Sequence, residues 1–203
     1  MSRMRVTSRN GMIQFEVDQR MLKVIEDALG DMKSESRKVL KNAVNKTAKQ
    51  AKADLAKKAQ ETYVVKKGRF TKAMATENAT SANPEATIKI TGEQLELKDF
   101  KVSPATYKPT GRPSVTKAKV LLSSSMKPLA SENRAFLARF KNGHVSVVQR
   151  KTKDRFPLKK LLSNSIPKMV GNQKKVYGIV EPHIYDNLMA NIYAEIGKVM
   201  KKT

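Results

Sequence analysis

The chain has 203 residues and a formal net charge of +23, because 41 Lys and Arg stand against 18 Asp and Glu. The excess positive charges repel one another, so the sequence predicts a negatively charged partner: nucleic acid, an anionic membrane surface or an acidic protein. Cysteine is absent, which excludes disulfides, thiolate metal sites and cysteine nucleophiles. No apolar run approaches the roughly 20 residues that span a bilayer, and the start MSRMRVTSRNG lacks the apolar stretch of a signal peptide. We therefore expect a cytoplasmically made protein with no membrane partner.

A chain of this length can bury a substantial core, and no long linker or internal repeat divides it. We expect one domain over residues 1–203, with residues 1–10 as a candidate flexible basic N-terminal arm. More than half of the net charge falls in residues 101–160, which carry 15 Lys and Arg against two Asp and Glu. The sequence therefore predicts a positive pole rather than a uniform positive surface.

Three elements are predicted at the N-terminal end. Residues 13–18 alternate apolar and polar side chains, which is the period of a strand with one buried face. The spacing then becomes helical and predicts a short helix that stops near Gly30. A longer helix is expected to follow, capped by Ser34 or Ser36 and ending at about Thr62.

The longer helix should bury one side and expose the other, since residues placed 100° apart separate into an apolar face and a basic face. The apolar face comprises Leu40, Val44, Ala48, Ala51 and Leu55, and the basic face comprises Lys38, Lys41, Lys46, Lys49 and Lys52. The basic face is typical of a solvated surface, and contact with a polyanion is the alternative.

The middle of the chain predicts short strands. After the long helix, a hinge at Gly68 and a short helix are expected. A hairpin is predicted over residues 88–97, with its turn at Gly92. Residues 101–133 are rich in Pro, Gly, Ser and Lys, and they predict one strand at residues 120–122 between long basic loops.

A second hairpin, over residues 135–151, has the strongest local signal, because Asn142-Gly143 favours a tight turn. Residues 152–172 predict a loop with two proline stops. The C-terminal helix is expected to begin at Pro182 and to bury an apolar stripe. This stripe comprises Leu188, Ile192, Ile196 and either Val199 or Met200. Together these elements predict an α+β fold in which an antiparallel β-sheet is covered by the long N-terminal helix and the amphipathic C-terminal helix.

Motifs for catalysis are missing from the sequence. His144 and His183 belong to no metal-binding spacing, and both are expected to be turn or surface residues. The nine glycines form neither a phosphate-binding loop nor a nucleophile elbow. Glu93, Glu96 and Asp99 could in principle hold a hard cation, but alternation in a strand would separate their side chains. Solvated sheet edges are the simplest interpretation of Glu93 and Asp99. We expect no enzyme activity, no metal and no cofactor.

The basic residues remain as candidates for a binding site. No element for sequence-specific DNA recognition is evident, and the 11 aromatic residues fall mostly in apolar strand positions, so base stacking is not expected. Phosphate contacts that ignore base sequence remain, and a solvated basic loop or an acidic protein partner is an equally open alternative. The candidate nucleic-acid-binding residues are Lys151, Lys153, Arg155, Lys159 and Lys160, followed by Lys66, Lys67 and Arg69.

The order of several segments resembles the minor tail protein Z family of tailed bacteriophages, also described as tail completion proteins. These segments are LKNAVNKTAKQAKADLAKKA, YVVKKGRFTKAM, IKITGEQLELKDF, AFLARFKNGHVSVVQRK and FPLKKLLSNSIPKMV, followed by the terminal helix. The resemblance covers most of residues 36–200 and is most specific from Phe136 to Val170. It departs from the family at residues 162–165, where Gly-Pro more often precedes the serine.

The resemblance implies a non-enzymatic structural virion protein at the head-proximal end of a phage tail, needed for head–tail joining. Assembly would occur in the host cytoplasm, and the protein would then reside in the tail or neck of the virion. The implied partners are further copies of itself in a ring, guessed to be a hexamer, and tail-tube, tail-terminator or head–tail connector proteins. A ring around the DNA channel would hold the phage DNA end through non-specific phosphate contacts.

Two alternatives come from other classes of protein. A sequence-independent nucleic-acid-binding protein of the cell would share the charge but not the ordered family segments. A basic nuclease is the third interpretation, and no motif supports it.

Overall fold

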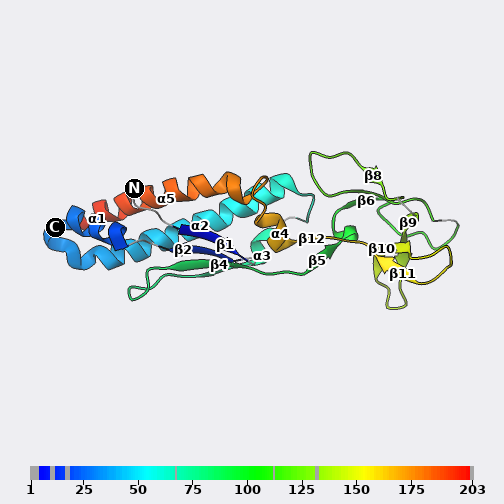
Figure 1. The fold of residues 1–203 in the computed structure, drawn as a ribbon, viewed down its shortest axis with the longest axis horizontal. Coiled ribbons are helices and arrows are strands. Elements are labelled where there is room, and N and C mark those ends of the chain that lie inside the picture. Colours follow the sequence, from blue (N-terminus) through cyan, green and yellow to red (C-terminus); the bar gives the residue numbers. More distant parts are fainter. Residues whose placement is uncertain are drawn as a thin grey trace.

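The computed structural model of the chain describes residues 5–9, 12–16, 19–66, 68–111, 113–130 and 133–201. The molecule is elongated (Figure 1). Long helices and one sheet form a body at one end, and short strands with long connections form a β-rich part at the other.

Two long helices dominate the body (Figure 1). Helix α1 (Gln19–Leu29) continues through the 3-10 turn η1 (Gly30–Glu35) into α2 (Ser36–Thr62), and α5 (Tyr177–Met200) lies alongside α2. The short helices α3 (Arg69–Lys72) and α4 (Ile166–Val170) also contact α2. These bounds confirm the predicted N-terminal helices and the short helix after Gly68, whose φ of +83° explains the glycine.

The predicted faces of α2 are confirmed, because its five apolar residues are at most 1% exposed. Lys38, Lys46 and Lys49 are exposed, whereas Lys41 and Lys52 are half-buried. The predicted serine cap is wrong.

The true N-cap of α2 is Glu35, which makes no capping side-chain hydrogen bond. The backbone N–H of Ser36 donates to the Lys33 carbonyl, so the preceding η1 turn satisfies the start of α2. The Ser36 hydroxyl instead donates to Glu26 Oε1 at 3.5 Å. The η1 turn, which directly precedes α2, therefore takes the place of a serine side-chain cap.

The strands of the described residues form four small antiparallel sheets. The first sheet has the strand order β1 (Arg5–Arg9), β2 (Met12–Glu16), β4 (Ala86–Ile90) and β3 (Met74–Glu77), and the second pairs β5 (Gln94–Glu96) with β12 (Leu162–Ser165). The third sheet has the order β6 (Lys101–Ser103), β7 (Lys117–Lys119) and β8 (Lys127–Pro128). The fourth has the order β11 (Leu158–Lys160), β10 (Val145–Arg150) and β9 (Ala135–Arg139). The first sheet packs on the long helices, and the last two belong to the β-rich end (Figure 1). The α+β prediction is thus confirmed.

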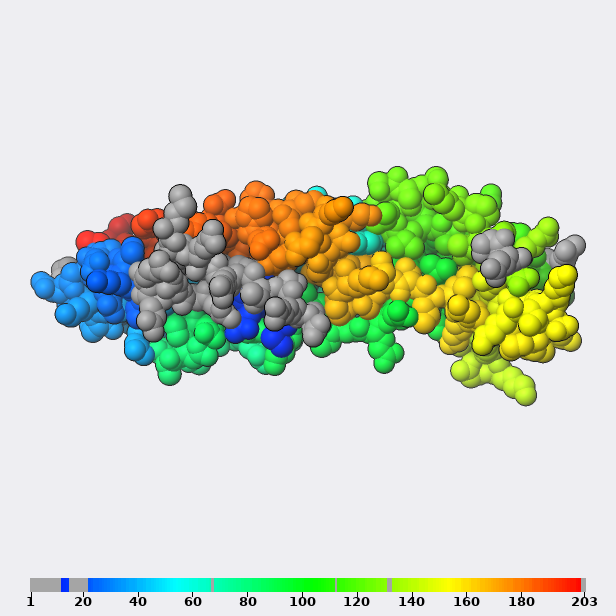
Figure 2. Space-filling view, in the orientation of Figure 1, coloured from blue at the N-terminus to red at the C-terminus, as the bar shows by residue number. Residues whose placement is uncertain are grey.

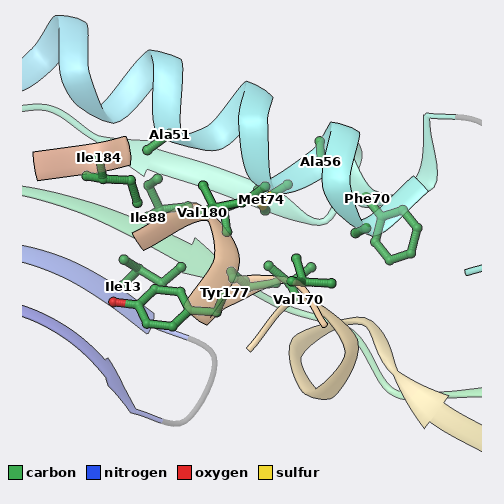
Figure 3. Packing of buried hydrophobic residues seen from close by; sticks show 14 of the residues in the cluster. Ile13, Ala51, Ala56, Phe70, Met74, Ile88, Val170, Tyr177, Val180 and Ile184 are labelled. Atoms are coloured by element: carbon green, nitrogen blue, oxygen red, sulfur yellow. The ribbon is translucent and has the colours of Figure 1, made fainter. Parts of the chain in front are cut away.

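The core joins the first sheet to the helices. Figure 3 shows Ile13 of β2 and Ile88 of β4 in one cluster with Tyr177, Val180 and Ile184 of α5. These five side chains are at most 5% exposed. This burial fixes the sheet to the helical body through the hydrophobic effect.

At the N-terminal end, β2 confirms the first predicted strand, but part of the expected flexible arm is also a strand. Residues Arg5–Arg9 form β1, which pairs with β2 over five residues. Residues 1–4 and 10 of the expected arm lie outside the described residues.

The hairpin predicted around Gly92 is wrong. β4 lies between β2 and β3, whereas β5 pairs with β12, about seventy residues later in the chain. Gly92 has a φ of +145°, which lets the chain leave one sheet and enter another. Leu97 belongs to a second 3-10 turn, η2 (Leu97–Asp99), rather than to a strand.

Two further predictions for the middle of the chain need correction. The strand expected at residues 120–122 lies earlier, because β7 ends at Lys119 and Leu121 forms only an isolated bridge with Tyr63. The loop expected over residues 152–172 contains β11, β12 and α4. Pro167 lies in the first turn of α4, where a proline is tolerated, and the Ser165 hydroxyl accepts a hydrogen bond from the Lys168 amide at 3.4 Å.

The C-terminal helix begins at Tyr177, five residues before the predicted Pro182. Pro182 removes one helical hydrogen bond, and packing of Tyr177 and Val180 in the core outweighs that loss. The apolar stripe is confirmed, with Val199 as its half-buried last member, whereas Met200 is 55% exposed. The hairpin around Asn142-Gly143 is confirmed by the β9–β10 pair.

Candidate nucleic-acid interface

Five candidate basic residues come together on the hairpin formed by β10 and β11. Lys151, Lys153 and Arg155 lie in the connection between the two strands, and Lys159 and Lys160 lie on β11. All five are exposed. In Figure 2 this segment is yellow and forms part of the β-rich end of the molecule. The five candidates therefore share one exposed hairpin, and their role in binding nucleic acid stays a prediction.

The second group of candidates lies elsewhere. Lys66 is exposed after α2, and Arg69 begins α3, in the body rather than at the β-rich end (Figure 1). Lys67 lies outside the described residues. The structure therefore does not join the second group to the first.

Two candidate cations already have carboxylate partners. Arg69 Nη1 lies 2.8 Å from Asp99 Oδ1, and Lys160 Nζ lies 3.0 Å from Glu96 Oε1. These contacts connect α3 with η2 and β11 with β5. The two cations are less available to an external polyanion than their exposure indicates.

Glu96 is at the centre of a polar cluster that holds the last sheet against β5. His144 Nε2 lies 2.9 Å from Glu96 Oε2, and the Lys160 ammonium lies 5.3 Å from the centroid of the Phe140 ring. Burial alone would raise the pKa of Glu96, but Ser146, His144 and Lys160 around its carboxylate outweigh burial and lower the pKa to about 2. This cluster is a structural junction.

The acidic residues considered for metal binding have separate surroundings. Glu93 is exposed, whereas Glu96 and Asp99 belong to the ion pairs just described, so Asp99 is not merely a solvated edge. Within the described residues, no group of three or more His, Asp or Glu side chains could hold a metal ion. His144 lies in the predicted turn, and His183 is exposed on α5.

A basic cavity beside the β10–β11 hairpin contains residues that sequence reasoning missed. Its volume is about 340 Å³, and its described lining includes three cationic side chains and no carboxylate. The lining residues are Pro113, Asn133, Arg134, Ala135, Phe136, Arg150 and Lys153. Of these, only Lys153 was a candidate.

A sequence signal for the two arginines does exist. The β9–β10 register pairs Ala135 with Gln149, and its continuation by one residue places Arg134 opposite Arg150. The confirmed turn at Asn142-Gly143 would have given this register. Pairing across the predicted hairpin, rather than counting charge along the chain, could have found the pair.

The outer face of α5, which is the side turned away from the core, lacks the positive charge of the cavity and exposes apolar side chains. Ile179, Tyr185, Tyr193 and Met200 are between 40% and 64% exposed. Residues 176–197 contain no Lys or Arg, although the chain has 41 of them. This exposed, apolar face without positive charge belongs to α5, which is orange to red in Figure 2 and lies on the helical body. Among the helices of the described residues, none is long and apolar enough to cross a bilayer.

Comparison with known proteins gives the family. The family model described as prophage minor tail protein Z (GPZ) matches residues 22–202. The chain belongs to this family. Comparisons with curated proteins and with solved structures found no match.

Membership of the minor tail protein Z family makes the chain a structural component of a phage tail and hence of the virion. The matched range runs from α1 to the end of α5, so it contains the basic cavity, the β10–β11 hairpin and the outer face of α5. The resemblance first seen in the order of segments is thereby confirmed.

Proposed function

We propose that this minor tail protein Z family member completes the head-proximal end of a phage tail. There it joins the tail to the head and holds the end of the genome through phosphate contacts that ignore base sequence. The observation that supports this proposal most is that the molecule has two different ends (Figure 1). The β-rich end holds most of the strongly basic residues 101–160, whereas the helical body exposes an apolar face on α5.

The outer face of α5 supports self-association into a ring. Two copies that each carry +23 repel one another, so they can approach only where positive charge is low. The outer face of α5 meets that condition and adds the exposed carboxylate of Asp186. Exposed apolar groups such as Tyr193 provide area to bury, and exposed α2 lysines such as Lys49 of a neighbouring copy provide complementary charge.

A ring built by this contact is heterologous, because the outer face of α5 in one copy meets a different surface of the next. The proposed number of copies is six. Such a ring would present several basic ends to the channel through which the genome passes, and tail-tube, tail-terminator or connector proteins would contact its remaining surfaces. In this proposal the surfaces only bind neighbouring proteins and DNA, and the function requires no catalytic residue.

Deletion of the gene from its prophage tests the proposal. After induction, electron microscopy should show DNA-filled heads and separate tails, and purified protein added to the lysate should restore joined, infectious particles. Joined particles at the normal level in the deletion lysate would overturn the proposal. Separate tails that also lack their normal length would indicate a role in tail growth instead.

A further inference from the structure

Arg134 and Arg150 form an unusual pair at the edge of the β9–β10 hairpin. The strand register continued from Ala135 and Gln149 places the two arginines opposite each other, and both line the same cavity. Like charges directly opposite in an antiparallel pair destabilise it. Lys153 brings a third positive charge to the cavity. A bound anion would turn this repulsion into attraction.

These three cations have no ion pair with any described residue. In that respect they differ from Arg69 and Lys160, which have carboxylate oxygens at 2.8 Å and 3.0 Å. The described lining of the cavity also offers no Asp or Glu. The positive charge at the cavity is therefore available to a ligand from outside the chain.

The backbone around the cavity is fixed in place by side-chain hydrogen bonds. The Asn133 amide donates to the Arg150 carbonyl at 3.2 Å, and the Gln149 amide donates to the Asn133 carbonyl. Ala135, also in the lining, is completely buried. Arg150 therefore extends from the last residue of β10 and Arg134 from the residue before β9, between backbone groups held by hydrogen bonds, which lowers the entropic cost of binding.

The chemistry of the cavity matches a phosphate group. Each guanidinium presents a planar fork of donors that suits two oxygens of a phosphate, and an ammonium adds a point charge. Two forks and one ammonium around a single cavity can contact a tetrahedral anion from several directions. Phe136 and Pro113 leave an apolar wall against which a sugar can lie.

We propose that the cavity between Arg134, Arg150 and Lys153 binds a phosphodiester group of the DNA backbone. The choice of phosphate follows from the cavity, and the choice of DNA rests on the proposed function. The neighbouring phosphates of the DNA would make weaker, non-specific contacts with three exposed residues of the adjoining β10–β11 hairpin, namely Lys151, Arg155 and Lys159.

The test measures binding of a short fluorescently labelled DNA duplex to the full-length protein over a series of salt concentrations. R134Q/R150Q should bind roughly tenfold more weakly than the unchanged protein, and its slope of log K against log salt should be smaller by about 1, the loss of one phosphate contact. K101Q/K117Q is the matched control, because it removes the same charge from exposed strand positions at the same end. The control should weaken binding far less than R134Q/R150Q does, because neither lysine lines the cavity. Equal weakening of both variants would overturn the proposal.

A second variant covers the case in which R134Q/R150Q does not fold. R134K/R150K keeps every charge but lacks the planar forks, so it should bind the duplex several-fold more weakly. Undiminished binding by this variant would overturn the cavity as the site. Polyglutamate that displaces the duplex from the unchanged protein as well as unlabelled duplex does would also overturn it, because the cavity would then serve an acidic protein.

The head–tail joining experiment separates this proposal from the proposed function. If the deletion lysate joins normally while R134Q/R150Q loses duplex binding, the cavity proposal stands and the proposed function falls. If joining requires the protein while all variants bind the duplex equally, the proposed function stands and the cavity proposal falls.

Discussion

The Asn191 side-chain amide of α5 donates a hydrogen bond to the Thr47 hydroxyl of α2 at 3.0 Å, inside the interface between the two long helices. It also donates to Gln50 Oε1 at 2.8 Å, and Asn191 is only 4% exposed. Asn42 of α2 also donates to Glu195 Oε2 of α5 at 3.2 Å, and such polar links fix how the two helices align.

Asn191→Ala should therefore lower the free energy of unfolding by about 1–3 kcal/mol, because it leaves buried partners without their donor. Urea unfolding measures this change. Asn187→Ala, at a half-buried position of the same helix, is the control and should change the free energy by less than about 0.5 kcal/mol. An equal effect of the two substitutions would show that the link to α2 contributes nothing.

Gly178 lies where the chain turns into α5, against the preceding loop. A Cβ at this position would overlap the Gln173 carbonyl oxygen, so Gly178→Ala should destabilise the protein by about 1–3 kcal/mol. Gly197 is in the same helix, where an added Cβ would meet no other described part of the chain within 4 Å, and Gly197→Ala should stabilise by about 0.5–1 kcal/mol. Thermal unfolding should move in opposite directions for the two variants, and a rise in both would contradict the close contact at Gly178.

Glu96 should make stability depend on pH. Its folded pKa of about 2 lies below the ordinary value of 4.5, so its contribution is present above pH 4.5 and is lost as the pH falls toward 2. Glu96→Gln should therefore be destabilising at neutral pH and should lose less stability than the unchanged protein between neutral pH and about pH 3. Urea unfolding at both pH values measures the difference. Parallel pH dependence of the two proteins would exclude Glu96 as a contributor.

Tyr193→Lys should block self-association without unfolding the chain. The side chain is 64% exposed on the outer face of α5, and the substitution puts a positive charge where two copies are proposed to meet. Thr71→Lys adds the same charge at an exposed position of α3 and should leave association intact. Sedimentation and incorporation into purified tails measure the effect. Rings formed by Tyr193→Lys would contradict the proposed contact.

Periodic, local features of this fold could be predicted from sequence. The faces of α2 and the β9–β10 hairpin depend on residues close in the chain, so spacing and the Asn142-Gly143 turn were sufficient. The β5–β12 pair was missed, because its two strands are distant in sequence and each is short. The early start of α5 is not evident from sequence, because Pro182 is a common helix-start residue and the core packing of Tyr177 depends on the folded structure.

The candidate interface was predictable to a similar degree. Charge counting found Lys151, Lys153 and Arg155, which do cluster on the hairpin. It could not show that Lys160 is paired with Glu96, since that contact joins residues 64 positions apart. It also missed Arg150, whose role depends on Arg134 across the hairpin rather than on neighbours along the chain.

A cryo-electron microscopy map of the intact virion neck tests the central claim most directly. The account predicts density for this protein as a ring at the head-proximal end of the tail, with α5 at the contacts between copies and residues 101–160 facing the DNA. Density at the distal tip of the tail, or a ring whose β-rich ends point away from the DNA, would contradict it.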